Sequence, residues 1–99
     1  TLKRANAERG YFMTDSSTWV AAKKDMQNLQ ILFRGDRFLV NTYNALVSAD
    51  EGSPGAILGS KFIDFVASDK GQAILSGYGK DKYGEGLYND AAYAKEYDR

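Results

Sequence analysis

The sequence contains no cysteine and no histidine, and both absences limit its chemistry. Without cysteine, the chain cannot form disulfide bonds, thiolate metal sites or a cysteine nucleophile. Without histidine, it lacks the commonest general base and the commonest transition-metal ligand, so a Ser-His-Asp triad cannot be built within it. No base and nucleophile pair is recognisable among the remaining polar residues. The sequence therefore predicts a protein that is not an enzyme and that carries no cofactor.

Charge and hydropathy exclude further partners. Thirteen Lys and Arg residues balance thirteen Asp and Glu residues, so no net charge attracts the chain to nucleic acid or to an anionic membrane. No apolar run approaches the roughly 18 residues of a membrane-spanning helix. The chain shows no signal-peptide pattern and begins at Thr1 without an initiator Met, which we interpret as a mature or excised part of a longer protein.

Helical and strand patterns alternate along the 99 residues. Helical spacing of apolar residues, with capping residues at the ends, predicts helices over 1–9, 15–24, 56–67 and 69–76, and a frayed helix or a loose tail over 90–99. Gly10 is expected to end the first of these helices, and Ser68 is expected to cap the one over 69–76. The glycine-punctuated segment over 79–88 is expected to be a loop. Short apolar runs predict strands over 11–14, 29–33, 38–49 with a break at 41–44, and 87–88. Such alternation favours an α/β layer architecture.

The most informative stretch is an apolar run that stops at Thr14-Asp15-Ser16-Ser17-Thr18, just before a helical pattern. These small polar residues are typical of a helix N-terminus, where backbone N–H groups lack partners. A helix start lined with hydroxyls can also hold an anion through neutral donors. Capping alone and oxyanion binding are both open interpretations, and they are compatible. Because its carboxylate would repel a dianion, Asp15 is expected to cap the helix or to orient a neighbour.

Four segments, in this order, resemble one family. They are Thr1 to Asn6 followed by Gly10-Tyr11-Phe12-Met13-Thr14-Asp15 and Thr18-Trp19; Ile31 to Asp36 followed by Leu39-Val40-Asn41-Thr42-Tyr43; Phe62 to Ser68 with Gly71-Gln72; and Tyr83-Gly84 to Leu87-Tyr88. The chain resembles the C-terminal part of periplasmic tungstate- or molybdate-binding proteins, which are the substrate-binding components of ABC transporters.

The resemblance implies an α/β fold that forms part of a two-lobe, type II periplasmic-binding-protein-like structure. Residues 1–40 would belong to the second lobe, with the candidate anion-side turn, and residues 41–99 to the crossing strand and the C-terminal end of the first lobe. The implied function is extracytoplasmic binding of a small inorganic oxyanion for ABC-type uptake, with the transporter permease as partner. The implied ligand-binding residues are Thr14, Ser16, Ser17, Thr18 and Tyr43, where Tyr43 is either a phenol donor or a half-buried aromatic residue.

Two positions depart from the family pattern. Ser16 stands where the family has Arg after Thr-Asp, so one hydroxyl donor replaces a cationic, bidentate group. Thr42 stands where the family has Pro between Asn and Tyr, which frees the local backbone. The alternative hypothesis is a degenerate structural or protein-interaction domain that has lost anion binding. In either case we expect the fragment to self-associate through surfaces that the rest of the protein would cover.

Overall fold

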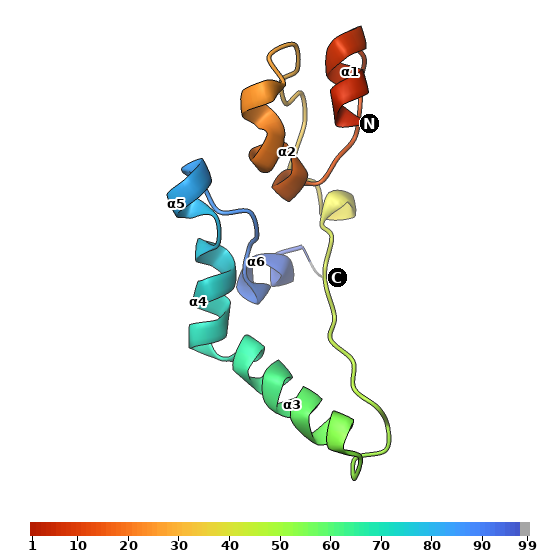
Figure 1. Cartoon of the computed structure of the whole chain (residues 1–99), viewed down its shortest axis with the longest axis vertical. Helices are drawn as coiled ribbons and strands as arrows, with labels where there is room; N and C mark the ends of the chain where they lie inside the picture. The colour runs from red at the N-terminus through yellow and green to blue at the C-terminus, as the bar shows by residue number, and fades with distance from the viewer. Residues whose placement is uncertain (98–99) are drawn as a thin grey trace.

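The computed structural model describes residues 1–97, and its regular elements are helices (Figure 1). The α-helices are α1 (Leu2–Glu8), α2 (Ser16–Ala22), α3 (Pro54–Ala67), α4 (Asp69–Gly77), α5 (Lys80–Tyr83) and α6 (Ala91–Lys95). Two 3₁₀ turns, η1 (Lys23–Asp25) and η2 (Arg37–Leu39), lie between α2 and α3. Helices α3, α4 and α5 follow one another along one side of the molecule, and α1 and α2 lie at one end.

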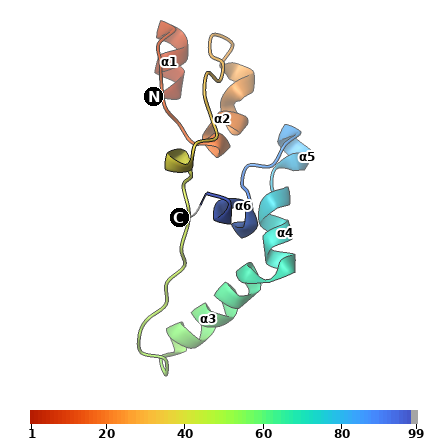
Figure 2. The same cartoon turned by 180° about the vertical axis from the view of Figure 1, so that it is seen from behind.

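The predicted α/β fold is wrong, because no strand occurs between residues 1 and 97. The segments that carry strand patterns, at 11–14, 29–33, 38–49 and 87–88, form no strand. The third overlaps the short 3₁₀ turn η2 at residues 38 and 39, and the rest of these segments is irregular. The connector from η2 to α3, residues 40–53, has no second extended stretch of chain alongside it (Figure 2). A strand exists only when a neighbouring strand accepts and donates its backbone hydrogen bonds, and a side-chain pattern alone does not supply that neighbour.

The predicted helices are present, and a side-chain cap lies at the start of four of them, α2, α3, α4 and α6. The side chains of Asp15, Ser53, Ser68 and Asp90 each accept a hydrogen bond from the backbone N–H three residues further on. This bond satisfies one of the N–H groups that the first helical turn leaves without a partner. The cap predicted at Ser68 is therefore present, and so is the capping role predicted for Asp15. Of the two alternatives predicted for 90–99, a frayed helix and a loose tail, the helix is present as α6. Residues 98 and 99 lie outside the described residues.

Three local details differ from the sequence predictions. Helix α3 begins at Pro54, two residues before the predicted start, with Ser53 as its cap. Helix α1 ends at Arg9, which itself takes the left-handed conformation at φ 54° one residue before the expected stop at Gly10. Helix α5 lies in the segment that was expected to be a glycine-rich loop. It is flanked by Gly79 and Gly84, whose φ values of 89° and 80° suit glycine best.

Helices α3 and α4 meet at a tight corner. A Cβ atom on Gly71 would lie 2.2 Å from the carbonyl oxygen of Phe65, so only glycine allows this approach. Gln72 joins the corner to α6, because its amide donates to the Val66 carbonyl at 2.8 Å and accepts from the Ala91 N–H at 2.7 Å. The side chain of Gln72 on α4 thus links this helix to both α3 and α6.

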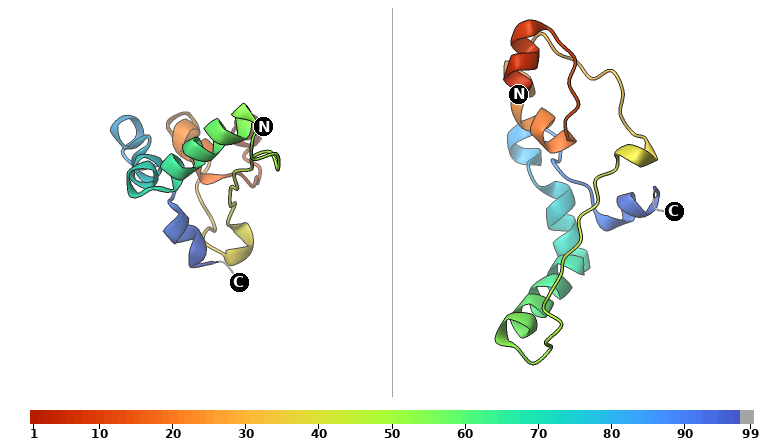
Figure 3. Two further views of the ribbon diagram at one scale, coloured as in Figure 1. Left: turned by 90° about the horizontal axis from the view of Figure 1, so that it is seen from below. Right: turned by 90° about the vertical axis from the view of Figure 1, so that its right-hand side faces the viewer.

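The molecule is open, and few of its residues are buried. The buried hydrophobic residues among those described are Val20, Met26 and Ala56. The Cα radius of gyration is 17.2 Å, whereas a compact chain of this length is expected at about 13 Å. The dimensions of 53 × 30 × 25 Å and the side views agree on an elongated form (Figure 3). Large apolar side chains therefore face solvent over much of the surface.

Candidate functional site

The start of α2 gathers the polar residues that the sequence singled out. The Asp15 carboxylate accepts the Thr18 N–H at 2.9 Å and the Thr18 hydroxyl at 2.7 Å. It also accepts the hydroxyl of Ser17. The structure thus brings Ser17 and Thr18 together around one carboxylate, and their hydroxyl hydrogens are directed at Asp15 in this arrangement.

These three donors stabilise the charged form of Asp15. The Ser17 hydroxyl, with the hydroxyl and backbone N–H of Thr18, lowers the Asp15 pKa from 3.8 to about 2. Hydrogen bonds to a carboxylate favour its ionised form, and the positive end of the helix dipole lies at the same place. The cap is therefore negatively charged at neutral pH.

Some donors at the start of α2 have no partner. Within residues 1–97, the backbone N–H groups of Ser16 and Ser17 donate no hydrogen bond, and no bond is made by the Thr14 or Ser16 hydroxyls. Thr14 and Ser16 are exposed, so these donors face solvent. The arrangement offers neutral donors to an anion, but it places the Asp15 charge beside them. A bound oxyanion would have to displace or tolerate that carboxylate.

Tyr43 stands apart from this cluster. It lies in the connector between η2 and α3, which runs away from α2 toward the start of α3 (Figure 1). Its side chain is 78% exposed, and its hydroxyl oxygen accepts a hydrogen bond from the Asn41 amide at 3.3 Å. Across the described residues, no hydrogen bond joins Tyr43 to residues 14–18. Its role as a ligand-binding residue stays a prediction.

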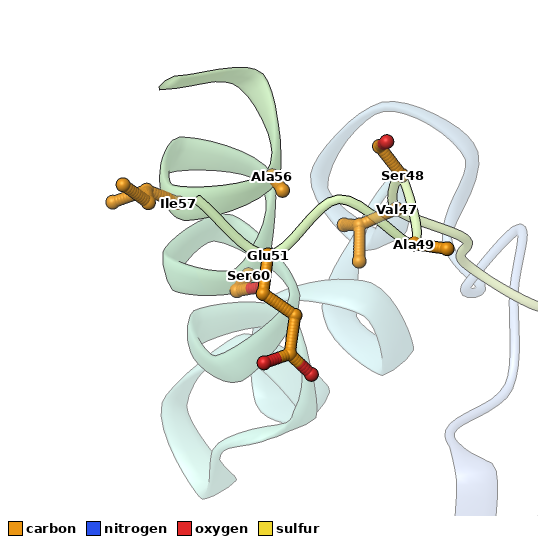
Figure 4. A pocket seen from close by; sticks show the side chains of 7 residues that line it. All are labelled: Val47, Ser48, Ala49, Glu51, Ala56, Ile57 and Ser60. Carbon is orange, nitrogen blue, oxygen red and sulfur yellow. The ribbon is translucent and has the colours of Figure 1, made fainter. Parts of the chain in front are cut away.

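A hollow of about 650 Å³ lies elsewhere, between the connector and the first turns of α3 (Figure 4). It is open to solvent and contains none of the predicted site residues. Its lining is Val47, Ser48, Ala49, Glu51, Ala56, Ile57 and Ser60. The charged group in this lining is the Glu51 carboxylate, which would repel an oxyanion. The hollow is therefore a poor candidate for anion binding.

Other classes of site find no support in the described part of the chain. Between residues 1 and 97, no cluster of three or more carboxylate, histidine or cysteine side chains is placed to bind a metal ion. Over the same residues, the helices are too short or too polar to cross a bilayer.

Comparisons with known proteins give one informative match. The chain is 32% identical over 93 residues to the tungstate-binding protein TupA of Peptoclostridium acidaminophilum. The aligned region is 92% of this chain but only 32% of that protein, so the chain spans about a third of the length of its relative. No family model matches the chain, and no solved structure matches it significantly. The chain is thus similar, at modest identity, to part of a tungstate-binding protein.

Proposed function

We propose that this protein binds tungstate, as the name of its relative implies, and takes part in uptake of the oxyanion. The observation that carries the proposal is the 32% identity to TupA, which extends over nearly all of the chain. Binding takes place outside the cytoplasm, and an ABC-type permease receives the anion. The protein is a carrier and not an enzyme. Molybdate, a tetrahedral oxyanion of the same charge, is the expected competitor.

The start of α2 is the proposed contact point with the anion on this chain. The N–H groups of Ser16 and Ser17 and the hydroxyls of Thr14 and Ser16 supply neutral donors there. Neutral donors bind oxyanions well at a helix N-terminus, because the unpaired N–H groups and the dipole both favour negative charge. Thr18 contributes once its hydroxyl turns from Asp15 toward the ligand. Tyr43 is proposed as a further phenol donor from the connector.

Isothermal titration calorimetry of the protein with sodium tungstate tests the proposal. Molybdate, sulfate and phosphate, at constant ionic strength, measure selectivity among tetrahedral oxyanions. We expect heat of binding with tungstate and molybdate, and weaker or no binding with sulfate and phosphate. Absence of heat with all four anions would contradict the proposal and would favour a structural or protein-interaction role.

Three substitutions and one control substitution test the position of the site. Ser16→Ala removes a hydroxyl donor and should weaken tungstate binding, whereas Ser60→Ala on α3 is the matched control and should leave it unchanged.

Asp15→Asn keeps a capping side chain but removes the negative charge, so tungstate binding should become several-fold tighter. If Asp15→Asn leaves the affinity unchanged, the anion does not bind beside α2. Ser16→Arg, which adds a cationic and bidentate donor, should raise the affinity further.

A further inference from the structure

Helix α3 carries large apolar side chains on a face that residues 1–97 leave largely exposed. Leu58, Phe62 and Phe65 lie at i, i+4 and i+7 and so share one side of the helix, which we call the outer face of α3. Their exposed fractions are 66%, 68% and 46%. Burial of two phenylalanines and a leucine would stabilise the protein, because the hydrophobic contribution grows with the apolar area removed from water. Their exposure is therefore costly for the chain as it stands.

The side of α3 that the molecule does cover holds smaller groups. Ala56 is buried, and Gly59 lies against Val47, where an added Cβ would come within 2.9 Å of a Val47 methyl carbon. Ile63 and Val66 are half-buried further along the helix. Polar residues are confined to the remaining side, at Ser60, Lys61 and Asp64. A helix that is apolar on two sides is typical of the interior of a larger protein, where both sides are packed.

The total surface area gives the scale of what is uncovered. The accessible surface is 8278 Å², whereas a compact monomer of 10.9 kDa is expected to expose about 5,600 Å². The excess of roughly 2,700 Å² is spread over the whole open molecule, and it is several times the roughly 800 Å² that one partner buries in a standard interface. It is too large to assign to a weak or transient contact.

The length of the relative indicates which segment covers the outer face of α3. The relative is a single polypeptide of which the aligned region is 32%, so about two thirds of such a protein lies outside this region. This remainder is long enough to supply packing partners for both the outer face of α3 and the connector. The chain has no net charge, so association through this face would rest on apolar burial, with no long-range attraction of a charged partner.

We infer that the outer face of α3 is an internal packing surface, covered by a further segment of the same polypeptide that lies outside residues 1–99. The inference uses the relative's length but not its ligand. It holds or fails independently of tungstate binding.

Site-specific photocrosslinking tests the inference. A benzoylphenylalanine replaces Phe62 in the protein produced from the whole reading frame that contains this sequence, and the crosslinked peptides are identified by mass spectrometry. The matched control places the same group at Lys61, on the polar side of the same helix. We expect an intramolecular crosslink from position 62 to a peptide outside residues 1–99, at several-fold higher yield than from position 61.

Any other crosslinking result would overturn the inference. A crosslink from position 62 to a second copy, seen at twice the monomer mass, would mean that the face is a homodimer interface. A crosslink within residues 1–99 would mean that the chain folds back on itself. Equal yields from positions 61 and 62, no crosslink, or a reading frame that encodes nothing beyond residues 1–99 would mean that the face stays in solvent. Calorimetry with tungstate on the same preparation keeps the outcome separate from that of the proposed function.

Discussion

The start of α2 and the outer face of α3 differ in how far their partners lie along the chain. At α2, Asp15 satisfies donors that are two and three residues away. At α3, the described residues leave the apolar side chains Leu58, Phe62 and Phe65 largely exposed. Hydrogen bonds can be made by close neighbours in sequence, whereas burial of a helix face needs a second surface from elsewhere.

Capping bonds and apolar burial therefore contribute differently to the free energy of unfolding of this chain. Local capping bonds contribute about 1 kcal/mol each, and they organise single helix ends. Burial contributes more per residue, but here it involves few side chains.

Met26→Ala should have the largest effect, because Met26 is 5% exposed and belongs to the small core beside α2. We expect a loss of about 2–3 kcal/mol in the free energy of unfolding, measured by urea denaturation followed by circular dichroism. Met13→Ala is the matched control, since Met13 is 79% exposed, and it should change the free energy by less than about 0.5 kcal/mol. Equal losses would show that Met26 is not buried as described.

Asp15→Ala removes the cap of α2 and should cost about 1 kcal/mol in the free energy of unfolding. Asp15→Asn retains an acceptor oxygen and should cost only a fraction of that amount. Urea denaturation of both variants measures the difference. If Asp15→Ala costs nothing, the hydroxyl and N–H donors of residues 17 and 18 find water equally well, and α2 does not depend on its cap.

The contribution of Asp15 should depend on pH in a defined direction. The folded-state pKa of about 2 lies below the ordinary value of 3.8, so the stabilisation is full above about pH 4. It is lost as pH falls from about 4 through about 2, because the carboxylate then takes up a proton. The stability difference between the natural protein and Asp15→Asn, measured by thermal unfolding over this range, should shrink accordingly. A constant difference would contradict the lowered pKa.

Phe62→Lys should have the smallest effect on the 99-residue chain. Phe62 is 68% exposed, so its replacement should change the free energy of unfolding by less than about 0.5 kcal/mol. Binding of a hydrophobic fluorescent dye should fall, because one large apolar group leaves the surface. In a longer protein that covers this face, the same substitution should cost several kcal/mol, since it would bury an unpaired charge.

Much of the helical structure was predictable from sequence, for reasons that particular residues make clear. Ser68 caps α4 and Asp15 caps α2, as predicted, because a capping residue acts on the third residue after it. The short helix α5 was missed, although Gly79 and Gly84 on either side of it carried a signal for two turns with positive φ. Gly71 gave no signal of its role, because the Phe65 carbonyl meets it only after α3 and α4 turn.

The candidate site was predictable in composition but not in arrangement. The sequence identified Ser16, Ser17 and Thr18 as donors at a helix start, and all three lie in the first turn of α2. It did not indicate that the Asp15 carboxylate would engage Ser17 and Thr18 together. Which hydroxyl turns toward which acceptor depends on side-chain rotation, and a sequence pattern carries no information about that rotation.

The sequence was sufficient to place the starts and the caps of α2 and α4, because capping interactions span three or four residues. It also determined that the chain has no thiol or imidazole chemistry. Only the tertiary structure decided that the apolar runs over 29–33 and 38–49 form no sheet, and that Leu58, Phe62 and Phe65 face outward. The physical reason is the same in both cases: a strand and an apolar helix face each need a partner surface from a distant part of a polypeptide, and local sequence cannot provide one.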